Sequence, residues 1–200
     1  MKLLQVLSLG ITLTLLVSGI GLGGYALSKR ITSVPCYGCM ALNPKFTPFK
    51  GFSTENVSHP DWVIDTLKDG KIVFIFLWST GCDPCTAQWV AMKNADIVKG
   101  TEENGGIGDR YKDEVKLFSL DTGSITDQRG EEAMNVYNPG GGTPTTVIIT
   151  LVNDNETNNV EIGWYSFMGY QHGNPTMSNL EQIIESGIYY YNENESQWTT

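Results

Sequence analysis

The sequence is poor in histidine and in basic residues. Its 200 residues include two histidines, His59 and His172, and neither has a partner at the spacing of metal ligands. The motif CxxCH is absent, which argues against covalently attached haem. With 13 basic and 22 acidic residues the formal charge is −9, so the composition does not favour binding to nucleic acid or to anionic lipid. We therefore expect no metal, no other cofactor and no nucleic-acid partner.

Charged residues are also missing from residues 3–27, which form an apolar run after Lys2. This run is long enough to span a bilayer, which takes about 20 residues, and it also resembles a signal peptide. We predict that residues 1–28 are a signal anchor or a cleaved signal peptide. Three Asn-x-Ser/Thr sequons, at Asn56, Asn155 and Asn194, fit a glycoprotein whose domain lies outside the cytoplasm, either anchored to the membrane or secreted.

The most informative stretch is KIVFIFLWSTGCDPCTAQWVAM, residues 71–92. Residues 72–78 are an unbroken apolar run rich in β-branched and aromatic side chains, which predicts a strand buried on both faces. After Cys85 the apolar residues take helical spacing. The residues predicted to share one side of this helix are Ala87, Val90, Ala91 and Ile97.

The motif Cys82-Asp83-Pro84-Cys85 therefore lies where a buried strand meets a helix. Pro84 suits a first helical turn because its missing N–H would be unpaired there. Free backbone N–H groups and the helix dipole favour a thiolate at that end, so we predict that Cys82 is the nucleophile. Cys85 is one turn further on and can close a disulfide with it. The charge of Asp83 opposes the thiolate, and the redox direction therefore does not follow from the sequence.

The segment FLWSTGCDPCTAQW resembles the active-site segment of the thioredoxin family, with Trp78 four residues before the first cysteine. A second similarity is Gly142-Thr143-Pro144-Thr145, which precedes another apolar run. The resemblance extends over residues 61–187. It implies that Pro144 is cis and faces the cysteine pair, and that Trp78, Thr143 and Pro144 contribute to substrate binding.

Two positions depart from the thioredoxin pattern. Phe76 stands where thioredoxins keep a buried acid, six residues before the first cysteine, and Gly81 stands where they have a tryptophan. Efficient reduction of protein disulfides of the general thioredoxin type is therefore in question.

The remaining patterns predict an α/β domain at residues 59–188. We expect a helix within 58–70, a strand at 115–120, a helix at 126–137, strands at 145–152 and 160–167, and a helix at 180–186 that is capped by Ser178 and closed by Gly187. This order is that of a thioredoxin-like fold, a central mixed sheet flanked by helices, here preceded by an N-terminal hydrophobic helix. Residues 189–200 are predicted to be a frayed tail.

A second pair, Cys36 and Cys39, lies in a linker-like region, residues 29–58. No buried strand precedes it and no helical pattern follows it, so it is not a second thioredoxin active site. Three roles for this pair remain open. It could be a structural disulfide, a redox pair that exchanges electrons with Cys82 and Cys85, or part of a zinc site formed together with Cys82 and Cys85.

We interpret the chain as a thiol–disulfide oxidoreductase that acts on protein thiols or disulfides, with a membrane electron-transfer protein as a further possible partner. One alternative is an oxidase of secreted proteins resembling DsbA. Only about thirty residues separate Cys85 from the next strand, however, which leaves no room for the inserted helical domain of that family. A second alternative is a thioredoxin-fold binding module whose CxxC is structural, and a third is a zinc-binding structural protein.

Overall fold

The computed structural model describes residues 52–54, 56–154, 159–169 and 174–198. The chain divides into two units, Met1–Cys36 and Tyr37–Thr200, and the described residues all belong to the second. The predicted anchor, the Cys36 and Cys39 pair and most of the 29–58 linker lie outside the described residues. Within the part of the chain that is described, no helix is long and apolar enough to cross a membrane.

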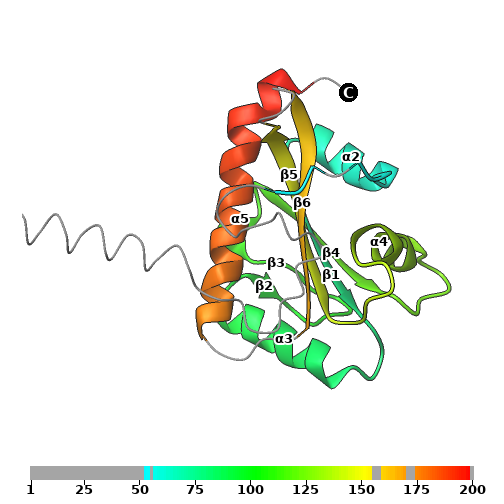
Figure 1. Cartoon of the computed structure of the whole chain (residues 1–200). Coiled ribbons are helices and arrows are strands. Elements are labelled where there is room, and N and C mark those ends of the chain that lie inside the picture. Colours follow the sequence, from blue (N-terminus) through cyan, green and yellow to red (C-terminus); the bar gives the residue numbers. More distant parts are fainter. Residues whose placement is uncertain (1–51, 55, 155–158, 170–173, 199–200) are drawn as a thin grey trace, which may run out of the picture. The chain divides into compact units, whose positions relative to one another are not determined.

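A four-stranded mixed sheet forms the centre of the described part (Figure 1). Its strands are β1 (Ile72–Trp78), β4 (Val115–Asp121), β5 (Thr145–Asn153) and β6 (Val160–Met168), in the spatial order β4-β1-β5-β6. Strand β1 pairs parallel with β4 and antiparallel with β5, and β5 pairs antiparallel with β6. All four strands stand where the hydrophobic pattern predicts them, and the mixed sheet is confirmed.

Four α-helices accompany the sheet in the described residues: α2 (Asp61–Lys68), α3 (Asp83–Asn94), α4 (Arg129–Tyr137) and α5 (Asn174–Asn194). Two short 3₁₀ helices are also present, η1 (Asp109–Tyr111) and η2 (Glu195–Gln197), together with a small hairpin of β2 (Val98–Lys99) and β3 (Gly106–Ile107). The element order is compatible with the thioredoxin-like fold that the sequence resembles.

Strand β1 is buried along its whole length because helices cover both faces of the sheet. Ile72 and Phe76 are four residues apart in a strand, so their side chains point to the same face. A β-carbon added to Gly187 of α5 would lie 3.2 Å from Ile72, and the ring of Trp89 in α3 lies 5.4 Å from that of Phe76. Helices α3 and α5 therefore cover one face, while α4 lies on the other (Figure 1).

The buried side of α3 differs from the predicted one. Val90 is 49% exposed, whereas Ile97, beyond the helix, is buried as expected. The helix residues that face the core are Cys85, Gln88, Trp89 and Met92. The helix is turned so that Trp89 and Met92, its bulkiest apolar side chains, enter the core, which removes more apolar area from water than burying Ala87, Val90 and Ala91 would.

Helix α5 is much longer than predicted, and residues 189–194 are not a frayed tail. Tyr191 and Asn194 are buried at 6% and 7% exposure. Gly187 lies inside the helix instead of ending it, because the missing side chain lets α5 approach the sheet closely. The close approach also brings the Gly187 carbonyl within 2.6 Å of the Thr150 hydroxyl, which donates a hydrogen bond to it.

Three predicted helix starts are also corrected. Helix α5 begins at Asn174, so Ser178 lies inside it and is not its cap. Within the predicted range 58–70, α2 begins only at Asp61, with Pro60 in the capping position and without a side-chain cap. The end of α2 is as predicted, since Gly70 follows it with a positive φ of 83°. Helix α4 begins at Arg129 rather than at residue 126.

Candidate redox site

Cys82 and Cys85 form a disulfide with an S–S distance of 2.05 Å and a Cα–Cα distance of 5.2 Å. Cys82 precedes the first residue of α3 and is partly buried, whereas Cys85 is in the first turn and 1% exposed. The two sulfur atoms therefore differ in access. Cys82 is the more exposed residue of the pair and therefore the one open to an incoming thiol or disulfide, while Cys85 is part of the core.

The N-terminus of α3 directs a backbone donor at the Cys82 sulfur. Cys82 is the N-cap residue, and its Sγ accepts a hydrogen bond from the backbone N–H of Cys85 at 3.2 Å. Pro84 lies in the first turn, as predicted. A thiolate on Cys82 would thus meet a donor and the positive end of the helix dipole as soon as the disulfide opens.

A second donor reaches the same sulfur from the loop before β5. The Thr143 hydroxyl donates to Cys82 Sγ at 3.7 Å and is also hydrogen-bonded to the Ser79 hydroxyl at 2.8 Å. The Thr143–Pro144 peptide bond is cis, as the resemblance implies. Residues 61 positions apart in the chain therefore meet at one sulfur atom. Sequence reasoning placed Thr143 here by resemblance but missed Ser79, for which the sequence gives no signal beyond its place after β1.

Trp78 lies at the end of β1 and is 8% exposed, so most of its indole is in the core. Its backbone carbonyl accepts hydrogen bonds from the N–H and the hydroxyl of Thr122, which fasten the β4–α4 turn to the end of β1. The indole Nε1 is buried and, among the described residues, has no hydrogen-bond partner. Its contribution to substrate binding stays a prediction.

The layer between α3 and the sheet is largely apolar, with one buried amide that is hydrogen-bonded to a threonine hydroxyl of β5. Phe76 is fully buried and packs against Trp89 with the two rings tilted by 52°, so an aromatic ring occupies the place of the thioredoxin carboxylate. Gln88 is 1% exposed, and its Nε2 donates to the Thr146 hydroxyl at 2.7 Å. Sequence reasoning missed Gln88. Its position three residues after Cys85 was a usable signal, because residues three apart share a helix face.

Acidic side chains lie within the Cys82–Cys85 motif or are hydrogen-bonded to threonines that flank it. Asp83 is exposed between the two cysteines. Asp121, at the end of β4, accepts a hydrogen bond from Thr80, and Glu102 accepts one from Thr86 on α3. Among the described residues, no group of three or more His, Cys, Asp or Glu side chains is placed to hold a metal ion.

His59 forms a structural contact and not a redox contact. Its Nδ1 is hydrogen-bonded to the Tyr137 hydroxyl at 2.9 Å. Burial lowers the pKa of His59 to about 4 and raises the pKa of Tyr137, so both groups are neutral near pH 7. The pair joins the segment before α2 to the end of α4.

One predicted sequon is unsuited to glycosylation in the folded protein. The Asn194 side chain is buried, and its Nδ2 donates to the carbonyls of Leu151 and Tyr190. Asn56 is exposed, and Asn155 lies outside the described residues.

Comparisons with protein-family models, with curated proteins and with solved structures found no match. Function must therefore be argued from the site. Of the residues predicted for it, Cys82, Cys85 and Thr143 come together, and Pro144 is adjacent to Thr143 in the chain.

Proposed function

We propose that the protein is a thioredoxin-like thiol–disulfide oxidoreductase that exchanges electrons with protein thiols or disulfides through Cys82 and Cys85. The observation that carries the proposal is the asymmetry of the disulfide. Cys82 is only partly buried and its sulfur receives two donors, whereas Cys85 is buried in the first turn of α3. Disulfide exchange needs this division between an attacking thiol and a resolving thiol.

The reaction in the reducing direction proceeds in two balanced steps. The Cys82 thiolate attacks a substrate disulfide, a Cys82–substrate disulfide forms, and one substrate thiolate leaves. Cys85 then loses its proton to solvent or to the departing thiolate and attacks the Cys82 sulfur. The Cys82–Cys85 disulfide forms and the second substrate thiolate leaves, so two electrons pass from the protein to the substrate. The same steps in reverse oxidise a substrate dithiol.

The reduced full-length chain should reduce a peptide that contains one intramolecular disulfide, with dithiothreitol regenerating the protein. We expect a rate at least about tenfold above that of dithiothreitol alone, because the positioned thiolate on Cys82 is a better nucleophile than a free thiol near pH 7. The double variant Cys82→Ser/Cys85→Ser is the matched control. A wild-type rate equal to that of dithiothreitol alone would overturn the proposal of an enzyme and favour the alternative of a thioredoxin-fold binding module.

We also propose that the domain works outside the cytoplasm, tethered through residues 3–27, and that Cys36 and Cys39 pass electrons between a membrane electron-transfer protein and Cys82. What supports this is the apolar N-terminal run and the place of the second CxxC just after it. A Cys36→Ser/Cys39→Ser variant should lose turnover in a membrane-coupled reduction assay while keeping its activity with dithiothreitol. Unchanged membrane-coupled turnover would contradict the relay.

A further inference from the structure

The Gln88 side chain holds an unpaired polar atom beneath the redox site. The amide is 1% exposed, and its nitrogen is occupied by the Thr146 hydroxyl. Its oxygen, Oε1, is buried and has no hydrogen-bond partner within the described residues. Leaving a buried acceptor unpaired is unfavourable by about 1–3 kcal/mol, so the oxidised form of the protein tolerates a polar group that it does not satisfy.

The atom that could satisfy this oxygen appears when the disulfide opens. Gln88 and Cys85 both lie on the buried side of α3, three residues apart, and side chains at that spacing have β-carbons roughly 5–6 Å apart. Phe76, Trp89 and Met92, which are buried in the same core, are apolar, and the one hydroxyl that contacts Gln88, that of Thr146, already accepts a hydrogen bond from its Nε2. Reduction gives Cys85 an S–H group in this layer, and a thiol is a weak donor that gains from an acceptor.

We propose that Gln88 is a positioning residue for the resolving thiol, with Oε1 accepting a hydrogen bond from the Cys85 S–H group in the reduced protein. The inference rests on the proposed function, since it assigns a role in the same dithiol–disulfide cycle. Thr146 holds the amide by its nitrogen and leaves the oxygen free for the thiol.

The amide does not ionise, so Gln88 takes no proton from Cys85. It acts on the balance between the two redox states. The proposed hydrogen bond exists in the dithiol form and is lost when Cys85 gives up its proton and bonds to the Cys82 sulfur. Gln88 therefore stabilises the dithiol relative to the disulfide, and its presence raises the reduction potential of the pair.

Gln88→Met removes the acceptor and keeps a side chain of similar length. The equilibrium with reduced and oxidised glutathione should shift toward the Cys82–Cys85 disulfide by about fivefold, which is about 20 mV at 29.6 mV per tenfold change. The two states are counted by alkylating the full-length protein and analysing the tryptic peptide 72–93. This peptide contains both cysteines and neither Cys36 nor Cys39.

Two further variants separate the hydrogen bond from packing. Met92→Leu changes a fully buried side chain on the same helix and should leave the equilibrium within about twofold of wild type. Gln88→Glu, measured near pH 6, should also stay within about twofold, because burial raises the pKa of a carboxyl and the neutral acid keeps an acceptor oxygen. If Gln88→Met does not fold, the equilibrium of Gln88→Glu still tests the proposed hydrogen bond.

The proposal is overturned if the glutathione equilibrium of Gln88→Met stays within twofold of wild type. It is also overturned if the equilibrium of Gln88→Glu shifts toward the disulfide by the about fivefold that is expected for loss of the acceptor. These outcomes differ from a failure of the proposed function. The glutathione equilibrium is measured whether or not the protein turns over a substrate, and an inactive wild type would leave the role of Gln88 in setting that equilibrium intact.

Discussion

Replacing Cys85 by serine should convert the protein into a trap that accumulates mixed disulfides with its clients. In this variant Cys82 keeps the Thr143 hydroxyl and the free N–H groups at the start of α3, so its thiolate still attacks a substrate disulfide. The resolving thiol is missing, and the Cys82–substrate bond can no longer be released from within the protein. Non-reducing gels followed by mass spectrometry should show bands that disappear on reduction.

Cys82→Ser is the matched control for the trap. The remaining thiol, Cys85, is 1% exposed, so it cannot reach a substrate disulfide, and the mixed disulfides at residues 82 and 85 should fall to background. Both variants lose the same disulfide and should therefore lose similar stability. Equal trapping by the two variants would contradict the assignment of the attacking and resolving thiols, and trapping by Cys82→Ser alone would reverse it.

The parts of the fold and site that follow from the sequence are local ones. Strand β1 is an uninterrupted apolar run, and the change to helical spacing after Cys85 gives the start of α3 to within a residue. The position of Cys82 at the helix N-terminus follows directly from these two patterns. Thr143 is 61 residues away and was placed only by its resemblance to a motif.

What the sequence does not reveal depends on how the helices turn against the sheet. The amphipathic pattern of α3 is weak, because Gln88 is polar and buried while Val90 is apolar and exposed. A prediction from the spacing of apolar residues therefore places Gln88 on the exposed side of the helix and Val90 on the buried side, and both placements are wrong. The unpaired oxygen of Gln88 becomes evident only when the rotation of the helix is known.

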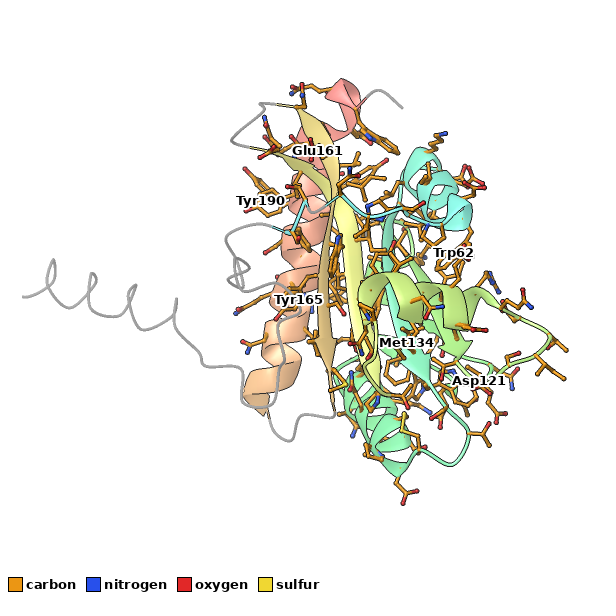
Figure 2. The ribbon with its side chains drawn as sticks, turned by 45° about the vertical axis from the view of Figure 1, so that its right-hand side comes forward. Trp62, Asp121, Met134, Glu161, Tyr165 and Tyr190 are labelled. Atoms are coloured by element: carbon orange, nitrogen blue, oxygen red, sulfur yellow. A yellow bond between two sulfur atoms is a disulfide. The ribbon has the colours of Figure 1, made fainter. Side chains whose placement is uncertain are left out.

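The end of α5 is a second feature that the sequence does not reveal. Gly187 is a typical helix stop in sequence, and the residues after it are polar enough to suggest a tail. In the fold Gly187 lets the helix pass close to β1 and β5, and the helix then continues for seven residues to Asn194. Figure 2 shows Tyr190 projecting from this last part of α5. Tertiary packing therefore outweighs the local stop signal.

Tyr191→Ala should destabilise the domain by about 3 kcal/mol, toward the lower end of the range for truncating a buried aromatic side chain. Tyr191 is 6% exposed, and its hydroxyl donates to the Leu67 carbonyl at the end of α2 at 2.6 Å. The substitution leaves a cavity where the buried ring of Tyr191 was, and it removes a hydrogen bond between residues 124 positions apart in the chain. The measurement is the urea dependence of the unfolding free energy of the full-length chain.

Two substitutions divide this loss into its parts. Tyr191→Phe keeps the ring and should cost only about 1 kcal/mol, the net value of one hydrogen bond, since the Leu67 carbonyl also accepts from the Gly70 N–H and is not left unpaired. Tyr189→Ala removes the same kind of side chain from the same helix, but Tyr189 is 60% exposed, so its effect should stay within about 0.5 kcal/mol. Equal, small losses for Tyr189→Ala and Tyr191→Ala would mean that residues 189–194 are a frayed tail in solution and that α5 ends near Gly187.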